Sequence, residues 1–356
     1  MSSFISAFLL VGAALAASSS VNIPGTVSSG DSTALWTSLA DSFDGPKISA
    51  VTSSSFDWWY FDAVSDDGQS SVVVTFFTST SSAFPFLVAI PNVTPVYVWT
   101  MEGTDSNVWL LQADSASVVT VGDGASGAWT GSGASFEGNA DMSTYSITLD
   151  AADNGISGTI SLSATAPAHY PCSPASVGQS MEVLPGVGWA NAVPDARATI
   201  DLSINGKAFS FTGSGYHDKN WSDEPFDANV DVWLWGRGSL GDYTVVWFDA
   251  IDTQGNEHAS AYVALNGQIV GQSCETTTVK VRGTGVAWPP TGEEPEAFHV
   301  DIDLGAAGVF SIDAKTETVI GGAGGSSYTR WSGSLSGSVN GSGNLTGVGI
   351  FDQILS

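Results

Sequence analysis

Apolar and polar side chains alternate along most of this chain, and this period of two limits the possible folds more than any other feature of the sequence. Residues 199–204 and 207–211 alternate on either side of Asn205-Gly206, a dipeptide typical of a two-residue β-hairpin. Residues 72–77 form a continuous apolar run, as expected of a strand buried on both faces. The pattern predicts an all-β fold of barrels or sandwiches, built from many short antiparallel strands.

A short internal repeat indicates two units of similar plan. The sequence FDAV at residues 61–64 recurs as FDAI at residues 248–251, and a turn glycine follows each copy. Chance similarity in a β-rich chain is the alternative explanation, and duplication is the interpretation that we prefer. Residues 171–194 are rich in Pro, Gly and Ser and would join the units. We therefore predict an N-terminal β-domain over residues 17–194 and a C-terminal β-domain over residues 195–356.

Three features predict secretion. Residues 4–17 form one apolar run that ends in small residues, which is typical of a signal peptide over residues 1–16 and too short to cross a bilayer. Cys172 and Cys274 are the two cysteines, and an even number in a secreted chain predicts a disulfide, with two separate buried thiols as the alternative. N-glycosylation sequons occur at Asn92, Asn340 and Asn344, and a fourth at Asn220 that we expect to be unused.

Charge and residue spacing exclude several classes of function. The chain has 36 acidic and 9 basic residues, a net charge of −27, which is incompatible with binding a nucleic-acid backbone. Its four histidines are scattered and predict no metal site. We find no nucleophile elbow, phosphate-binding loop, dinucleotide fingerprint or further apolar segment of transmembrane length. Paired carboxylates for glycoside hydrolysis stay open as an alternative, because the acidic residues offer many pairs.

Two motifs carry a resemblance to a known family. The first is FDWWYFDA at residues 56–63, and the second is GYHDKNWS at residues 215–222 together with WLWGR at residues 233–237. This combination resembles the hydroxyneurosporene synthase-like, or AttH-like, superfamily of two lipocalin-like barrels joined through an aromatic interface. The chain looks most similar to the fungal Diels–Alderases, which also show a segment like AHYPC at residues 168–172. Lys219 stands where the carotenoid hydratases of the superfamily have a second histidine, which disfavours a hydratase.

The resemblance implies cofactor-independent chemistry on small unsaturated molecules. With the predicted secretion, it is closest to secreted enzymes that join a tropolone quinone methide to a sesquiterpene by hetero-Diels–Alder addition. A cycloaddition needs two partners held in reactive geometry and a polar donor near a carbonyl, so an apolar, aromatic pocket is expected. An isoprenoid hydratase, dehydratase or isomerase and a non-catalytic terpenoid carrier are the alternatives. No nucleic acid and no membrane is expected as a partner, and the sequence leaves the oligomeric state open.

The candidate site residues come from both motifs and from the aromatic residues around them. We expect a site between the barrels, or at the mouth of the first barrel that faces the second. The alternative for each aromatic residue is a place in a core, for Asp57 a turn or a cap, and for Lys219 and Arg237 a structural latch. The predicted catalytic residues are Asp57, Tyr170, Lys219 and Trp221. The predicted substrate-binding residues are Trp58, Trp59, Phe61, Trp235, Arg237 and Trp331.

Overall fold

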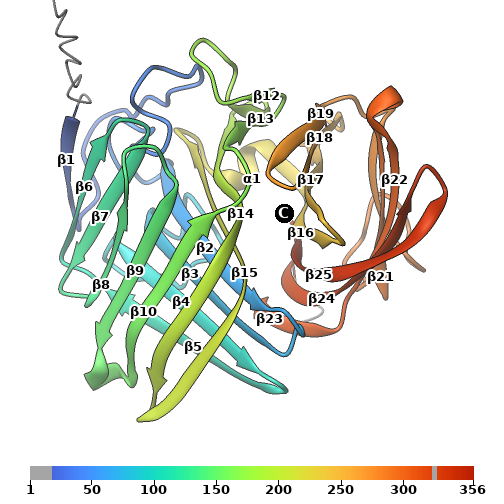
Figure 1. The fold of residues 1–356 in the computed structure, drawn as a ribbon. Coiled ribbons are helices and arrows are strands. Elements are labelled where there is room, and N and C mark those ends of the chain that lie inside the picture. Colours follow the sequence, from blue (N-terminus) through green and yellow to red (C-terminus); the bar gives the residue numbers. More distant parts are fainter. Residues whose placement is uncertain (1–17, 323–326) are drawn as a thin grey trace, which may run out of the picture.

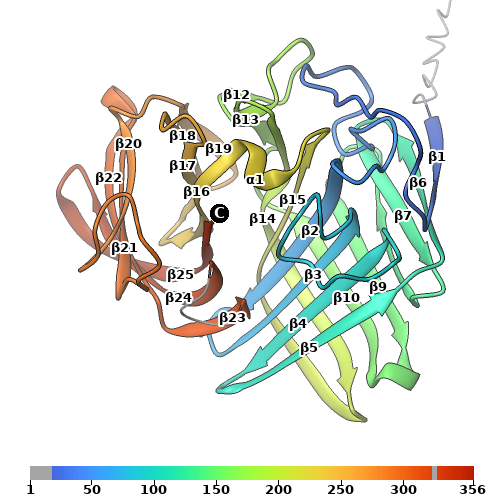
Figure 2. The same ribbon diagram turned by 180° about the vertical axis from the view of Figure 1, so that it is seen from behind.

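The computed structural model describes residues 18–322 and 327–356, so the predicted signal peptide lies outside the described residues. It is an all-β protein of two antiparallel sheets, and Figures 1 and 2 show the larger, N-terminal sheet curling beside the smaller, C-terminal one. This confirms the predicted fold class.

The larger sheet contains β1 Ser18–Pro24, β2 Phe56–Ser65, β3 Ser70–Thr78, β4 Pro95–Glu102, β5 Asp105–Gln112, β6 Ser115–Val121, β7 Gly124–Thr130, β8 Ala134–Gly138, β9 Thr144–Ala151, β10 Ile156–Ala164, β11 His169–Tyr170, β12 Ser173–Pro174, β13 Glu182–Leu184, β14 Val187–Ile204 and β15 Lys207–Ser222.

The smaller sheet follows a one-turn helix, α1 Phe226–Asn229. Two 3₁₀ turns, Ala152–Asn154 and Gly305–Ala307, complete the regular structure of the described residues. The strands of the smaller sheet are β16 Val230–Leu240, β17 Tyr243–Asp252, β18 Glu257–Leu265, β19 Gln268–Ser273, β20 Val279–Gly283, β21 Ala297–Asp303, β22 Val309–Lys315, β23 Thr318–Gly322, β24 Tyr328–Val339 and β25 Ser342–Leu355.

The two sheets share one strand order. The larger runs β5-β4-β3-β2-β15-β14-β10-β9-β8-β7-β6-β1, and the smaller runs β19-β18-β17-β16-β25-β24-β22-β21-β20. When the two orders are aligned from their first strands, β5 and β19, β2 takes the same place as β16, and β15 the same place as β25. The FDAV and FDAI segments lie in β2 and β17, which are not equivalent strands, so the repeat does not mark a duplicated position. The two sheets are similar in the order of their strands, not in this sequence repeat.

The change from one sheet to the other occurs later than the predicted join. β14 runs through position 194 and pairs along its length with β15, so both strands that follow the Pro- and Gly-rich stretch belong to the larger sheet. The chain reaches the smaller sheet only between Ser222 and Val230. The predicted Asn205-Gly206 hairpin is confirmed: both residues have positive φ, +51° and +77°, as a two-residue hairpin turn requires.

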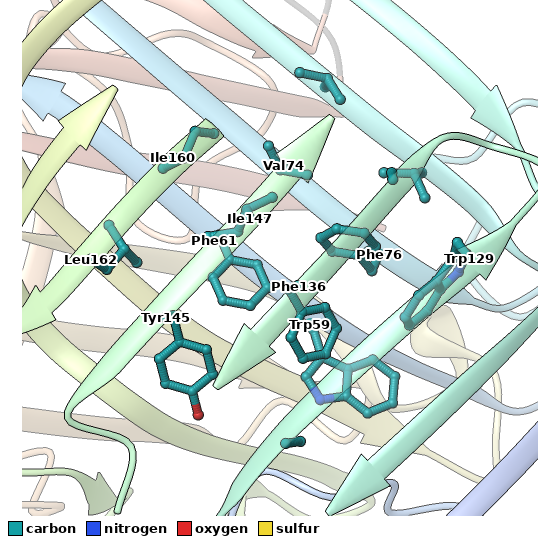
Figure 3. Packing of buried hydrophobic residues seen from close by; sticks show 14 of the residues in the cluster. Trp59, Phe61, Val74, Phe76, Trp129, Phe136, Tyr145, Ile147, Ile160 and Leu162 are labelled. Carbon is teal, nitrogen blue, oxygen red and sulfur yellow. The ribbon is translucent and has the colours of Figure 1, made fainter. Parts of the chain in front are cut away.

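Within residues 18–322 and 327–356, the buried apolar side chains form three cores. One lies inside the curl of the larger sheet, where Trp59, Phe61, Phe76, Trp129 and Phe136 pack against one another, as Figure 3 shows. A second lies within the smaller sheet. The third lies between the sheets and draws its side chains from both. Two of the three cores therefore stabilise one sheet each, and the third joins the sheets.

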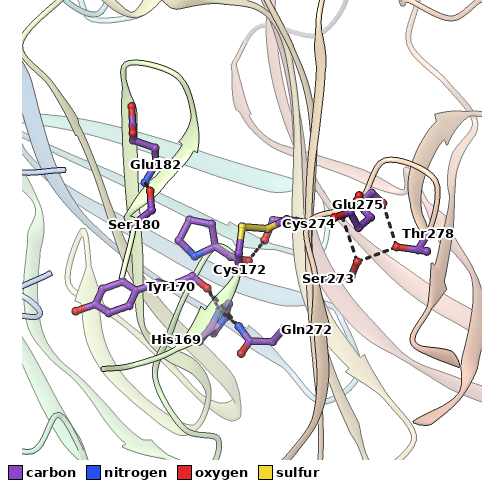
Figure 4. The surroundings of a disulfide bond; sticks show 12 residues. His169, Tyr170, Cys172, Ser180, Glu182, Gln272, Ser273, Cys274, Glu275 and Thr278 are labelled. Atoms are coloured by element: carbon purple, nitrogen blue, oxygen red, sulfur yellow. Dashed lines mark hydrogen bonds between the residues drawn. A yellow bond between two sulfur atoms is a disulfide. The ribbon is translucent and has the colours of Figure 1, made fainter. Parts of the chain in front are cut away.

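A disulfide also joins the sheets. Cys172, between β11 and β12, is bonded to Cys274, which follows β19, as predicted (Figure 4). Next to it, the His169 ring stacks on Tyr262 of β18 with their centroids 4.0 Å apart. Ser260 Oγ donates a hydrogen bond to the carbonyl of Pro171 at 2.6 Å. The segment before β12 is thus fixed to the smaller sheet by a covalent bond, a stacked pair of rings and a hydrogen bond.

Candidate active site between the two sheets

The alternation of side chains along β2 divides the first motif between two environments. Trp59 and Phe61 point into the core of the larger sheet, as Figure 3 shows. Trp58 and Tyr60 point to the other face and belong to the core between the sheets. On β16, Trp233 and Trp235 also face this shared core, because successive residues of a strand point to opposite faces. The corresponding strands of the two sheets therefore present their aromatic residues to each other.

A cavity lies where these aromatic faces meet. Its free volume is about 60 Å³, and it is partly open to solvent. Most of its walls are aromatic, and its polar groups are few. The walls are formed by Trp58, Tyr60, Thr75, Phe77, Phe84, Phe86, Leu87, Asp218, Asn220, Phe226, Trp233, Trp235, Phe248, Tyr328, Arg330, Asp352 and Ile354.

One buried ion pair lies beside the cavity and connects the two equivalent strands. Asp62 of β2 accepts a hydrogen bond from Arg237 of β16 through Oδ1, and its Oδ2 accepts one from the Tyr60 hydroxyl at 2.7 Å. Arg237 also donates to Ser214 Oγ at 2.6 Å. Both oxygens of Asp62 are therefore bonded. Arg237 does not itself line the cavity, so its predicted substrate contact is revised to a structural pairing between the sheets.

A second buried ion pair is part of the cavity wall. Nε and Nη2 of Arg330 both donate to Oδ2 of Asp352, the former at 3.1 Å. The guanidinium lies over the Tyr60 ring, 4.5 Å from its centroid, and 5.5 Å from the centroid of Trp235. Burial raises the pKa of Asp352, and the nearby guanidinium opposes this shift. Arg330 is thus held in one orientation by a carboxylate and two rings.

Asp218 of β15 is the third charged residue of the cavity wall. Its Oδ2 accepts hydrogen bonds from Trp189 Nε1 at 2.8 Å and from the Tyr216 hydroxyl at 2.7 Å. Both bonds use one oxygen, and Asp218 is one of the residues that line the cavity. Burial raises the pKa of Asp218 to about 7, although both hydrogen bonds lower it. The group therefore exchanges a proton near neutral pH, as a general acid or base must.

The predicted catalytic residues Asp57, Lys219 and Trp221 come together, but inside the larger sheet. Lys219 Nζ donates to Asp57 Oδ1 at 2.7 Å and lies 3.9 Å from the centroid of the Trp59 ring. The backbone N–H of Lys47 donates to the other oxygen, Asp57 Oδ2. A recess of about 180 Å³, lined in part by residues 48–51, reaches Asp57, but both carboxylate oxygens are already bonded. This cluster fixes the N-terminal segment inside the larger sheet.

The remaining predicted residues divide in the same way. Trp58 and Trp235 line the cavity, as expected for substrate contacts. Tyr170 stacks on Phe43 at 4.6 Å in the core of the larger sheet, and in Figure 4 its ring points away from the disulfide. Trp331 is 2% exposed and packs in the core of the smaller sheet. The structure thus brings neither Tyr170 nor Trp331 to the cavity, because both are enclosed by the core of one sheet.

Several cavity residues were not among the predicted site residues. Tyr60 lies within the first motif, one position from a chosen residue, and its side chain takes the opposite face. Arg330 was detectable as one of only nine basic residues, at alternating spacing from Tyr328 on one strand. Asp352 had no local signal, because β25 reaches the cavity only through its pairing with β16 and β24. These residues were missed for one reason: the cavity wall combines residues from both sheets, which lie far apart in the sequence.

The described residues contain no cluster of three or more His, Cys, Asp or Glu side chains suited to hold a metal ion. Over the same residues, no helix has the length and apolar character needed to cross a membrane. The charged groups of the cavity wall are the Arg330–Asp352 ion pair and Asp218, whose pKa is about 7; Thr75 and Asn220 add neutral polar groups.

Two antiparallel sheets of matching strand order, with an aromatic cavity between them, define an all-β two-sheet protein with a candidate site at the sheet interface. Comparison with known proteins specifies the family. The chain belongs to the Diels-Alderase-like family, whose model matches residues 23–287. The family assignment agrees with the resemblance found in the two motifs.

Relatives support this assignment, and a solved structure shows the same fold. The chain is 32% identical over 330 residues to the quinolone epoxide rearrangement protein penF of Penicillium thymicola, covering 89% of this chain and 90% of that protein. It is 30% identical over 245 residues to the Diels-Alderase ucsH of Acremonium sp, covering 65% and 59%. The crystal structure of CghA with Sch210972 has the same fold, with a TM-score of 0.75, 18% identity and coverage of 95% and 98%. By their names, the relatives in this family are enzymes that act on small molecules.

Proposed function

We propose that this chain is an enzyme that rearranges a small, unsaturated, ring-containing molecule in the cavity between the sheets, with Asp218 as the proton donor. One observation carries the proposal: Asp218 lines an aromatic cavity, receives hydrogen bonds only from the neutral donors Trp189 and Tyr216, and has a pKa of about 7. The similarity to penF over nearly the whole chain favours an epoxide as the substrate group. The match to the Diels-Alderase ucsH covers less of the chain, so it supports a cycloaddition less strongly than the match to penF supports an epoxide.

The arrangement suits acid-assisted opening of an epoxide. Protonated Asp218 would donate its proton to the epoxide oxygen while one C–O bond breaks, which leaves a hydroxyl group and a positive charge on carbon. The electron-rich faces of Trp58, Trp233 and Trp235 would stabilise that charge. A neighbouring group then migrates, and the Asp218 carboxylate takes up the proton that the rearranged cation releases. Proton, charge and bonds balance without a further reactant.

Asp218 is the suitable acid because the other buried carboxylates at this interface already have a cationic partner. Asp62 pairs with Arg237, and Asp352 pairs with Arg330. Asp218 receives only neutral donors, from Trp189 and Tyr216. A carboxyl group buried without a direct cation favours its protonated form, which is the form that donates.

A [4+2] cycloaddition is the second candidate, and membership of the Diels-Alderase-like family favours it. In the form that the sequence suggested, a quinone methide and a terpene would lie between the aromatic walls. The Arg330 guanidinium would donate to the carbonyl of the heterodiene. This reaction transfers no proton, so it does not require Asp218 to titrate. The two candidates therefore predict different pH profiles.

Asp218→Asn tests the proposal, because Asn still accepts hydrogen bonds through its carbonyl but cannot supply the proton. With a quinolone epoxide as substrate, we expect the variant to lose at least about 100-fold in turnover. The wild-type rate should fall as the pH rises through about 7, since the acid form is then lost. Asp66→Asn, at an acid whose side chain is 65% exposed, is the control and should keep the wild-type rate.

Full turnover in Asp218→Asn would refute the acid role. If the variant and the wild type equally accelerate the coupling of a quinone methide with a terpene, the cycloaddition is the better assignment. Solvent oxygen appearing in the product would indicate a hydratase. Release of every added ligand unchanged would indicate a carrier.

We also propose that the protein is secreted. The predicted signal peptide and the Cys172–Cys274 disulfide support this proposal, since disulfides persist in oxidising compartments. Asn340 and Asn344 are exposed on the hairpin that joins β24 and β25, whereas Asn220 is buried and its amide donates to the carbonyl of Gly188. Peptide mapping of protein from the culture medium should find glycans at Asn340 or Asn344 and none at Asn220. Protein retained in the cells, without glycans, would contradict secretion.

A further inference from the structure

His169 is a fully buried polar side chain that the proposed reaction does not use. It lies on β11, in the AHYPC segment at residues 168–172, and it is not one of the residues that line the cavity. A polar ring without access to water is unfavourable unless its nitrogens are bonded. The contacts that satisfy this ring therefore indicate what it holds in place.

The two ring nitrogens of His169 are bonded to different sheets. In the larger sheet, Asn191 Nδ2 donates to the carbonyl of His217 at 2.9 Å, so Asn191 Oδ1 accepts from His169 Nε2 at 3.0 Å. From β19 of the smaller sheet, Gln272 Nε2 donates to His169 Nδ1 at 3.2 Å and to the adjacent carbonyl of Tyr170 at 3.3 Å (Figure 4). Burial lowers the pKa of His169 to about 4, so the ring is neutral at neutral pH.

The ring of His169 also contacts the ring of Trp189 on β14. Their centroids are 5.1 Å apart and their planes are 78° from parallel. The stack of His169 on Tyr262, with planes only 7° from parallel, fixes the plane of the imidazole. Trp189 makes a second edge contact, at 4.7 Å, with Phe248 of the cavity wall. The Trp189 indole is therefore held by His169 and by one wall residue.

The orientation of this indole matters because Trp189 bonds the proposed acid. Trp189 Nε1 donates to Asp218 Oδ2 at 2.8 Å. A hydrogen bond to a carboxylate favours its charged form, and this bond lowers the pKa of Asp218 against the effect of burial. Because a hydrogen bond weakens steeply as its angle departs from linear, a rotated indole would lose most of this effect.

We propose that His169 is a positioning residue for the proton donor: it holds the Trp189 indole so that Nε1 stays directed at Asp218. His169 touches no substrate and acts only through Trp189. The inference deepens the proposed function and rests on it, because it concerns the acid named there. It also gives the AHYPC segment a role at the site, since the Cys172–Cys274 disulfide and the stack on Tyr262 fix His169 to the smaller sheet.

Other titratable and charged groups also surround Asp218, and they come from four strands. They are Tyr216 and His217 of its own strand, Tyr60 of β2, and Arg330 and Asp352 of the smaller sheet. Within the described chain, the ring contacts and side-chain hydrogen bonds of His169 given above involve none of these side chains. A change at His169 that alters the pKa of Asp218 therefore acts through Trp189.

Infrared titration of the folded protein tests the inference without a substrate. The carboxyl C=O absorption that Asp218→Asn removes reports the protonated form of Asp218. Trp189→Phe deletes the donor and should raise the pKa of Asp218 by about one pH unit. His169→Leu should raise it in the same direction. The double variant His169→Leu, Trp189→Phe should match Trp189→Phe alone, because His169 has no effect once the indole N–H is gone.

Turnover of a quinolone epoxide supplies the second measurement. His169→Leu should lower kcat about tenfold and leave KM within about twofold of wild type, because neither His169 nor Trp189 lines the cavity. The fall in rate with rising pH should move to higher pH together with the infrared midpoint. His169→Phe should restore both values toward wild type, since it keeps a planar ring against Trp189.

Trp247→Phe is the matched control, since it shortens a buried tryptophan in the core of the smaller sheet that does not line the cavity. It should keep the infrared midpoint and the pH profile of the wild type. If His169→Leu does not fold, Tyr262→Leu removes the stacking partner of His169 and should shift the midpoint in the same direction. An unchanged midpoint in a folded variant of either residue, or additive shifts in the double variant, would overturn the proposal.

The two measurements separate this inference from the proposed function. Loss of turnover in Asp218→Asn, together with an unshifted midpoint in His169→Leu, would refute the positioning role alone. A shifted midpoint together with full turnover in Asp218→Asn would refute the acid role and leave the link between His169 and Asp218 in place.

Discussion

Asp62 and Arg237 form a buried ion pair between β2 and β16, the two strands that hold equivalent places in their sheets. Both side chains are at most 1% exposed. Asp62→Ala would leave the Arg237 guanidinium buried without its carboxylate, which costs about 3–5 kcal/mol in comparable cases. We expect the free energy of unfolding to fall by that amount, as measured by denaturant titration.

The pair of Arg197 and Asp66 provides the control for this prediction. Arg197 Nη1 and Asp66 Oδ1 are 3.2 Å apart, but the side chain of Arg197 is 55% exposed and that of Asp66 is 65% exposed. Asp66→Ala should change the free energy of unfolding little, because exposed pairs contribute about 0–1 kcal/mol. Similar effects of Asp62→Ala and Asp66→Ala would show that burial does not set the strength of the interface pair.

Asp218 should make stability depend on pH. In the unfolded chain an ordinary Asp loses its proton near pH 4 (about 3.9), whereas folded Asp218 keeps it up to about pH 7. The folded state binds more protons in this interval, so the contribution of Asp218 to stability falls as the pH rises from about 4 to about 7. Asp218→Asn removes this dependence. The free energy of unfolding of the variant, relative to wild type, should rise across the interval and level off above it.

Reduction of the Cys172–Cys274 disulfide should lower the melting temperature. The two cysteines are 102 residues apart in sequence, and closing a loop of that length contributes about 4–5 kcal/mol in the chain-entropy model. The bond also crosses between the sheets, so the stacking of His169 on Tyr262 should loosen with it. Differential scanning calorimetry of the oxidised protein and of a Cys172→Ser, Cys274→Ser double variant measures the effect. Identical transitions would contradict it.

Two tryptophan variants should differ in what they affect. Trp331→Ala leaves a cavity in the core of the smaller sheet and should cost about 3–5 kcal/mol of stability, with little change in ligand affinity for the folded fraction. Trp58→Ala removes part of the cavity wall between the sheets and should weaken the binding of a quinolone epoxide. Fluorescence titration together with thermal unfolding distinguishes the two. A selective loss of affinity in Trp331→Ala would restore its predicted stacking role.

The sequence was sufficient for the fold class because the period of two is a local property. The hairpin at Asn205-Gly206 and the fully buried strand near residues 72–77 were predicted from neighbouring residues, and both are present. Membership of the family also followed from two contiguous motifs. The division between the sheets was not predictable in the same way, because β14 is one continuous strand across the expected join.

The candidate site was predicted less well, for a geometric reason. The motif around Trp58 does reach the cavity, but alternate residues of a strand face different environments, and sequence alone does not say which face meets a core. Asp57, Trp59 and Phe61 thus entered the larger sheet, while Trp58 and Tyr60 entered the cavity. Arg330 and Asp352 joined them only through pairing between strands far apart in sequence. Contacts of this kind depend on how all the strands of a sheet pair, which the local sequence does not specify.

The division of each wall strand between two faces also bears on how such a cavity changes during evolution. On β2 and β16, the residues that face the other sheet and the residues that pack in the core of their own sheet occupy alternate positions. Selection can therefore exchange one set while keeping the other, so that new substrates are acquired without rebuilding the scaffold. Because the wall is shared between two sheets, each can vary its half independently. This modularity would let one architecture serve both epoxide rearrangement and cycloaddition.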